Sequence, residues 1–173
     1  MAKTVELRRH AASDGDVLTP DGIAAAVAIG ERLAGGYDLM VSSGAQRATQ
    51  TLACFLAGLG RQRPCGVTVD SGLRSTQEER WFAAAKRSGG GSLDAFIRTD
   101  PDLVKDEAKT LGEALRRVFD GLPEGGRALV VGHSPMHETA IFGLTGTIVA
   151  PISKGAGVLI VEDGGKYRVE PLA

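Results

Sequence analysis

Two arginines and two histidines in this sequence are of the types needed to bind and transfer a phosphate group. Arg9 and His10 lie in LRRHAAS, Arg47 in SSGAQRATQT and His133 in VVGHSPMHE. Paired guanidinium groups hold a phosphate dianion through forked hydrogen bonds. A neutral imidazole can attack phosphorus and form a phosphohistidine, while a protonated imidazole can stabilise the charge of the transition state. This chemistry requires the fold to bring the four residues together.

These four residues lie close to the ends of predicted strands. Short apolar or alternating runs predict strands at Thr4–Leu7, Asp38–Val41, Val67–Val69 and Ala128–Val131. Arg9 and His10 follow the first of them, Arg47 lies one helical turn beyond the second, and His133 follows the last. In open α/β sheets, ligands bind beyond the carboxyl ends of the strands. We therefore expect one site at that edge. Arg8 should face away from Arg9, because strand side chains alternate, and act as a surface or salt-bridging residue.

Helical segments separate the predicted strands. Thr19 and Pro20 form a typical helix start, and Gly35-Gly36 ends that helix. The side chains expected on its buried face are Ile23, Val27 and Leu33, and further helices are expected after Ser43 and over Glu107–Leu122. The tail GVLIVEDGGKYRVEPL predicts a hairpin. The fold class predicted is α/β: a three-layer sandwich with a mainly parallel sheet, helices on both faces and a C-terminal edge hairpin.

Length and composition indicate one domain over residues 1–173, with a specificity insertion around 71–105. Lys and Arg (20) nearly balance Asp and Glu (21), so no nucleic acid and no anionic membrane is expected as a partner. No apolar run approaches the ~20 residues of a membrane span, which predicts a cytoplasmic protein. Cys54 and Cys65 lie in no metal-ligand spacing and are expected to be free thiols.

The segments LRRHAAS, LTPDGIAAAVAIGERL, SSGAQRATQT and VVGHSPMHE, in that order, resemble the motifs of the histidine phosphatase superfamily, the phosphoglycerate-mutase-like group. Ala11 stands where the first motif usually has glycine. The Arg-His-Ala-x-Ser form, the short chain and the LTG at Leu144–Gly146 look most like the small phosphohistidine-phosphatase-like branch. The resemblance is weak between about Asp70 and Asp106.

The resemblance implies a role for each matching residue. His10 would be the phosphorylated nucleophile, Arg9 and Arg47 would bind phosphate, and His133 would complete the pocket. It also implies that no metal and no organic cofactor takes part. The serines expected to contact substrate are Ser13, Ser43 and Ser134, and each has an alternative as a turn or helix-capping residue.

The general acid for the leaving group is the point at which this sequence departs from the family pattern. Many members carry a glutamate two residues after a leucine that follows the third strand, where this chain has Ser75. Glu78 and Glu79 lie a turn later, and we prefer Glu79 over Glu78. The alternative is that no dedicated acid exists, which would favour a good leaving group such as a phosphoramidate.

The predicted function is hydrolysis of a phosphomonoester or phosphoramidate, on a phosphorylated small molecule or a phosphoprotein. The alternatives are a mutase-type phosphoryl transferase and a non-catalytic module that binds phosphate or phosphohistidine. A third is a three-histidine metal centre of His10, His133 and His137, which a helix start at Pro135 would disfavour. The phosphate-binding loop GxxxxGK[ST] is absent from the sequence, which argues against a P-loop kinase. The sequence predicts no oligomeric state.

Overall fold

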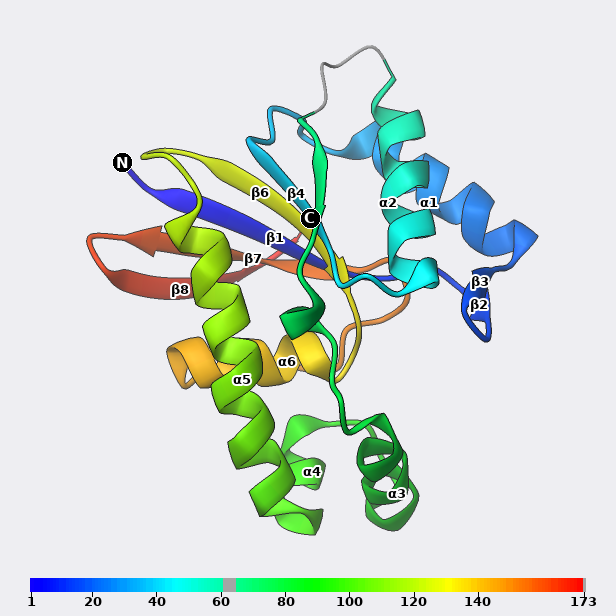
Figure 1. Cartoon of the computed structure of the whole chain (residues 1–173), viewed down its shortest axis with the longest axis vertical. Coiled ribbons are helices and arrows are strands. Elements are labelled where there is room, and N and C mark those ends of the chain that lie inside the picture. The colour runs from blue at the N-terminus through cyan, green and yellow to red at the C-terminus, as the bar shows by residue number, and fades with distance from the viewer. Residues whose placement is uncertain (61–64, 173) are drawn as a thin grey trace.

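The computed structural model describes residues 1–60 and 65–172, and its centre is a six-stranded sheet (Figure 1). The strands of this sheet are β1 (Lys3–Arg9), β4 (Leu39–Ser42), β5 (Val67–Val69), β6 (Arg127–Gly132), β7 (Gly157–Asp163) and β8 (Lys166–Pro171). Their spatial order is β5-β4-β6-β1-β7-β8. Strands β5, β4, β6 and β1 are parallel, while β7 and β8 form an antiparallel hairpin at the edge next to β1. The predicted strands and edge hairpin are therefore confirmed.

Helices cover both faces of the sheet. The helices are α1 (Pro20–Arg32), α2 (Gln46–Leu59), α3 (Glu78–Ser88), α4 (Leu93–Thr99), α5 (Pro101–Asp120) and α6 (Met136–Thr145). Figure 1 shows α1 and α2 on one face and α5 and α6 on the other. The remaining short elements are the β2 (Ser13–Asp14) and β3 (Val17–Leu18) ribbon and the 3₁₀ turn η1 (Ser71–Leu73). This arrangement is the predicted three-layer α/β sandwich.

The central strand β6 supplies alternate residues to two separate cores. Ala128 and Val130 pack into the core under α5 and α6, whereas Leu129 and Val131 pack into the core under α1 and α2. All four side chains are fully buried. A parallel strand covered on both faces has this continuous apolar composition because neither face meets water.

The buried face of α1 differs from the prediction. Leu33 is buried as expected, but Ile23 is 45% exposed and Val27 is only half-buried, while Gly22, Ala26 and Gly30 face the interior. A methyl group at Gly30 would overlap the backbone of α2 at Phe55, so the two helices approach closely through small residues. Backbone proximity therefore decides the orientation of α1, and the larger apolar side chains turn outward.

The segment between β5 and β6 is more helical than predicted. The α5 helix begins at Pro101, six residues before the predicted Glu107, because the Asp100 carboxylate caps it by accepting from the Leu103 amide. Helices α3 and α4 lie beside the amino-terminal end of α5 (Figure 1), and α3 packs on α4.

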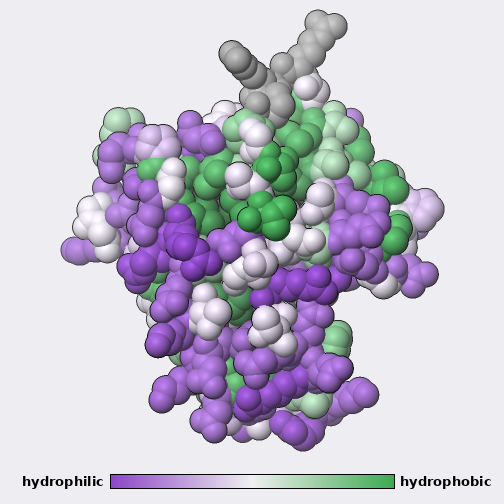
Figure 2. Space-filling model, in the orientation of Figure 1, coloured by the Kyte–Doolittle hydropathy of each residue, from purple (hydrophilic) through white to green (hydrophobic). Residues whose placement is uncertain are grey.

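The molecular surface differs between its two ends in Figure 2. Hydrophilic residues dominate over α3 and α5, whereas apolar residues gather near β5, where Val67 and Val69 are 42% and 63% exposed. Cys54 and Cys65 are free, as predicted. None of the helices in the described ranges has the length and hydropathy to cross a membrane.

Candidate active site

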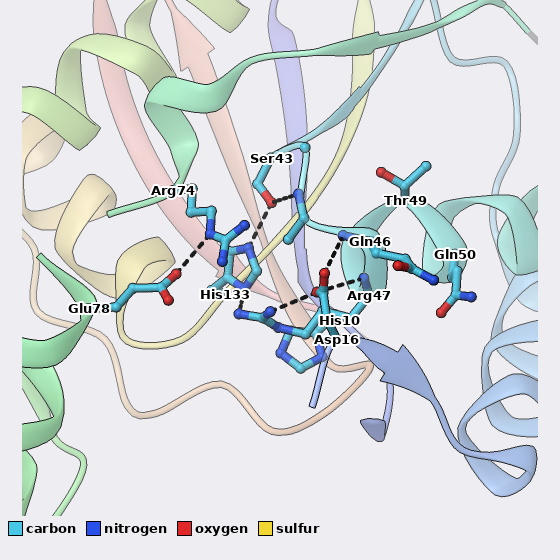
Figure 3. A network of polar contacts seen from close by, with 12 residues as sticks. His10, Asp16, Ser43, Gln46, Arg47, Thr49, Gln50, Arg74, Glu78 and His133 are labelled. Atoms are coloured by element: carbon cyan, nitrogen blue, oxygen red, sulfur yellow. Dashed lines mark hydrogen bonds and ion pairs between the residues drawn. The ribbon is translucent and has the colours of Figure 1, made fainter. Parts of the chain in front are cut away.

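The carboxyl ends of β1, β4 and β6 open onto a pocket of about 620 Å³. All four of the residues expected there, Arg9, His10, Arg47 and His133, line it. The His10 amide donates to the Gly132 carbonyl at 2.9 Å, which joins the ends of β1 and β6. The two imidazole rings lie 5.4 Å apart between centroids, at an interplanar angle of 56°. Figure 3 shows His10, His133 and Arg47 converging from separate elements.

The environment of His10 fixes its tautomer. Its Nδ1–H donates to the Ala11 carbonyl at 2.8 Å, so Nε2 carries the lone pair. The Ala11 amide in turn donates to Thr51 Oγ1 of α2 at 3.0 Å. Burial and, to a smaller extent, the nearby cations Lys154 and Arg47 lower the pKa of His10 to about 4, against the opposing effect of the hydrogen bond to Ala11. At neutral pH the ring is therefore uncharged, with a free basic nitrogen.

His133 has a different set of partners. Its Nδ1 lies 3.2 Å from Nη2 of Arg47 and its Nε2 lies 2.7 Å from Ser43 Oγ. Guanidinium groups only donate, so Nδ1 accepts and Nε2–H donates to the buried serine. Burial and the charge of Arg47 lower the pKa of His133 to about 2. His133 is therefore neutral in the absence of a ligand.

Arg47 is held in place from outside its own helix. Asp16 Oδ1 accepts from Arg47 Nη1 at 2.9 Å and from its amide at 3.2 Å, and Asp16 Oδ2 accepts from the Gln46 amide at 3.3 Å (Figure 3). The N-cap residue of α2, Ala45, has no side chain that could do this. Asp16 thus caps α2 from the β2–β3 ribbon and orients the arginine at the same time.

Arg9 and Arg8 point to opposite sides of β1, as the strand alternation predicted. Arg9 Nη1 donates to the Ile152 carbonyl at 3.1 Å, while its buried Nε has no partner among the described residues. Burial lowers the pKa of Arg9, and the nearby carboxylate of Glu138 opposes that effect. Arg8 instead forms an ion pair with Glu6 at 2.6 Å, so it is the salt-bridging residue that was expected.

The predicted serines take different places. Ser13 and Ser134 line the pocket, and Ser134 Oγ donates to Glu138. Ser43 does not line the pocket: it is 1% exposed, and its Oγ lies 2.7 Å from His133 Nε2. The helix-capping alternative does not hold for Ser43, because Asp16 takes that role for α2.

The two candidate acids at the start of α3 differ in their position relative to the pocket. Glu78 lines the pocket with the two histidines and pairs with Arg74 Nε at 2.8 Å. Glu79, which the sequence favoured, is exposed and lies outside this pocket. The order QEER alone carried no information on which face of α3 turns toward the sheet.

Two residues at or beside the pocket, Lys154 and Glu138, were not predicted from the sequence. Lys154 lines the pocket, and burial, followed by the charges of Arg9 and Arg47, lowers its pKa. The predicted hairpin was a signal for Lys154. An antiparallel strand beside β1 begins where β1 ends, so the loop before β7 lies at the same edge of the sheet as the pocket. Glu138, 1% exposed, accepts from the Ile152 amide at 2.8 Å and from Ser134, and therefore ties α6 to the Lys154 loop.

The three histidines do not converge. His137 is buried and its Nε2–H donates to the Arg8 carbonyl at 2.9 Å, beneath β1 and away from the pocket. Helix α6 begins at Met136 after Pro135, as predicted, so His133 precedes it. Across residues 1–60 and 65–172, no cluster of three or more His, Cys, Asp or Glu has the geometry to hold a metal ion.

The model of the histidine phosphatase superfamily (branch 1) matches residues 3–151. The chain belongs to this superfamily. The family resemblance of the four motifs is thus confirmed, and the Arg9–His10, Arg47 and His133 segments all lie within the match. A search of the curated proteins gave no significant match.

Solved structures of the superfamily share the fold at low sequence identity. A phosphoglycerate mutase from Bacillus anthracis str. Sterne superposes with a TM-score of 0.77 at 18% identity, over 99% of this chain and 92% of that one. A phosphoserine phosphatase from Entamoeba histolytica in complex with 3-phosphoglyceric acid gives 0.70 at 17%, covering 99% and 98%. The protein histidine phosphatase SixA, complexed with tungstate, gives 0.60 at 17%, covering 96% and 94%. Mutases and phosphatases therefore both occur on this architecture.

Proposed function

We propose that this protein is a phosphatase that hydrolyses a phosphomonoester or phosphoramidate through a covalent phosphohistidine on His10. The observation that carries the proposal is the hydrogen bond from His10 Nδ1–H to the Ala11 carbonyl. It leaves Nε2 as the nucleophilic atom in a pocket that also contains Arg9, Arg47 and His133. No metal or organic cofactor is needed for this chemistry.

In the first step, His10 Nε2 attacks phosphorus in line and the bond between phosphorus and the leaving group breaks. Arg9, Arg47 and Lys154 bind the phosphoryl oxygens, and their charges stabilise the transition state. In the second step, water attacks the phosphohistidine, the P–N bond breaks and inorganic phosphate leaves. His10 is then regenerated as the neutral ring.

His133 takes up a proton in this mechanism when substrate binds. The free protein holds it neutral, because burial and Arg47 lower its pKa to about 2. A bound dianion beside the ring attracts Arg47 and raises the pKa of His133, so the ring becomes a donor to the phosphoryl oxygens. Ser43 keeps the ring in position throughout.

We assign the general acid to Glu78 in place of Glu79. Glu78 lines the pocket at the start of α3, whereas Glu79 faces solvent outside it. Arg74, 2.8 Å from Glu78, holds the carboxyl group in its place. Glu78 would donate a proton to the leaving oxygen from its protonated form, in which it is not ion-paired with Arg74, and would then take a proton from the attacking water of the second step.

Turnover of p-nitrophenyl phosphate tests the proposal. We expect the parental protein to release nitrophenol and the His10→Ala variant to lose at least about a thousandfold in kcat, because the nucleophile is gone. Circular dichroism should show that both are folded. Activity of the alanine variant within a few fold of the parent would contradict the proposal. A folded parent that binds phosphate without turnover would instead be a phosphate-binding module.

A further inference from the structure

The pocket has two chemically different walls. One wall carries the cationic and imidazole groups that the proposed function assigns to the phosphate. The other wall is apolar, and its residues are Trp81, Phe82, Ala85, Phe96, Pro135 and Met136. Helices α3 and α4 supply the first four of these, so the segment that varies most from the family motifs forms this wall.

The deeper part of the apolar wall is rigid. Trp81 is 3% exposed and meets Phe96 edge to face, with 5.0 Å between ring centroids. The Trp81 Nε1–H donates to Glu107 of α5 at 3.3 Å. Since its Nε1–H already has a hydrogen-bond partner and its ring is packed, Trp81 forms the rigid base of the apolar wall.

Phe82 follows Trp81 in α3 and is 68% exposed. Among the described residues it is the only aromatic side chain in the set of exposed large hydrophobics, and it lines the pocket. When an apolar group of a ligand covers an exposed phenyl ring, apolar surface is removed from water and the complex is stabilised. The position of Phe82 therefore favours a ligand with a hydrocarbon part.

Two arginines close to the apolar wall are paired within the protein. Arg80 binds Asp100 at 2.7 Å and Arg74 binds Glu78 at 2.8 Å. A carboxylate or a second phosphate on the substrate would have to break one of these pairs to bind Arg74 or Arg80. Phosphorylated sugar acids and phosphoamino acids are poorly matched to such a wall.

Resting on the proposed function, we propose that the substrate is a small phosphomonoester of an apolar alcohol, with its hydrocarbon part against Phe82 and Met136. The phosphate occupies the end with His10, and the leaving group extends along the wall formed by α3 and α4. The segment around 71–105 then sets specificity through Trp81 and Phe82. A folded phosphoprotein segment would be a weaker ligand, because its polar backbone would lie against apolar side chains.

Binding of n-alkylphosphonates, measured by calorimetry on the intact protein, tests this inference. Their P–C bond cannot be hydrolysed, so affinity is measured without turnover. From ethyl- to butyl- to hexylphosphonate we expect a gain in affinity of up to about fourfold per methylene. A chain ending in a carboxylate should bind more weakly than the alkyl chain of the same length.

The Phe82→Ala variant should lower the gain to less than about twofold per methylene, while the affinity for inorganic phosphate stays unchanged. Ile23→Ala on α1 is the matched control: it also removes an exposed apolar side chain, but one outside the pocket. Affinity that is independent of chain length, tighter binding of the carboxylated chain, or no phosphonate binding at all would overturn the inference. The turnover assay with His10→Ala decides the proposed function separately, so the two can fail independently.

Discussion

The two pocket histidines are the same residue type with different roles, and their hydrogen-bond partners make the difference. His10 donates from Nδ1 to a backbone carbonyl and keeps Nε2 free, whereas His133 has Arg47 on one nitrogen and Ser43 on the other. The partner of His10 is a backbone carbonyl, whereas Arg47 Nη2 can exchange His133 Nδ1 for an oxyanion while Asp16 keeps Nη1. In the proposed mechanism the nucleophile is therefore preorganised, and a bound oxyanion would raise the pKa of His133.

Replacement of Arg47 tests the phosphate-binding role at the residue scale. We expect Arg47→Ala to weaken inhibition by orthovanadate by about ten- to a hundredfold, because a charge-assisted, forked contact is lost. The inhibition constant measures the effect. Arg116→Ala removes an exposed arginine from α5 outside the pocket and is the control. An unchanged inhibition constant in the Arg47 variant would show that this guanidinium does not bind the oxyanion.

Much of the site could be predicted from single residues and their order along the chain. Arg9, His10 and His133 follow strands with clear apolar patterns, and parallel strands must end at one edge. The choice between Glu78 and Glu79 could not be made, because it depends on how α3 is rotated against the rest of the fold. Lys154 was missed for a related reason: its loop has no periodic pattern, and only the antiparallel placement of β7 brings it to the site.

At the scale of elements, close helix packing depends on glycines at contact points. The α1 helix buries Gly22, Ala26 and Gly30 instead of Ile23, because the backbone of Ala12 lies against Gly22 and the backbone of α2 lies against Gly30. An apolar periodicity cannot show this, since it counts the hydrophobicity of side chains and not the space available for them. On the other face of the sheet, Gly143 of α6 similarly faces the backbone of α5 at Ala108.

Gly143→Ala should destabilise the protein although alanine favours a helix. A methyl group there would overlap the Ala108 carbonyl oxygen, so α5 and α6 would have to separate. We expect a loss of about 1–3 kcal/mol in the free energy of unfolding, measured with urea. Gly90→Ala is the control, since the added methyl group meets no atom within 4 Å there. Equal stability of the two variants would show that the contact between the helices relaxes without cost.

At the scale of the whole molecule, three buried neutral histidines make folding sensitive to acid. The pKa is lowered to about 4 for His10 and His137 and to about 2 for His133, mainly by burial. As the pH falls, the histidines of the unfolded chain bind protons near pH ~6.5, whereas those of the folded chain bind them only at lower pH. Stability is therefore complete above that value and is lost as the pH falls toward 4. Glu138 acts in the opposite sense, because burial raises its pKa.

We expect each of these histidines to lower the free energy of unfolding by about 2 kcal/mol when the pH falls from ~7 to ~5. Urea denaturation at both values measures the loss. His137→Gln can still donate to the Arg8 carbonyl but cannot be protonated, so its stability should fall by about 2 kcal/mol less than that of the parent. The same loss in parent and variant would mean that His137 does not hold the lowered pKa in solution.

The most direct test of the central claim is to trap the phosphorylated protein during turnover. Rapid quenching of a reaction with p-nitrophenyl phosphate into alkaline denaturant, followed by peptide mass mapping, locates any covalent phosphoryl group. We predict one phosphoryl group on the peptide that contains His10, stable in alkali and lost in acid, and none on that peptide in the His10→Ala variant. Turnover without a phosphoryl group on His10, or with one on a different residue, would contradict the account.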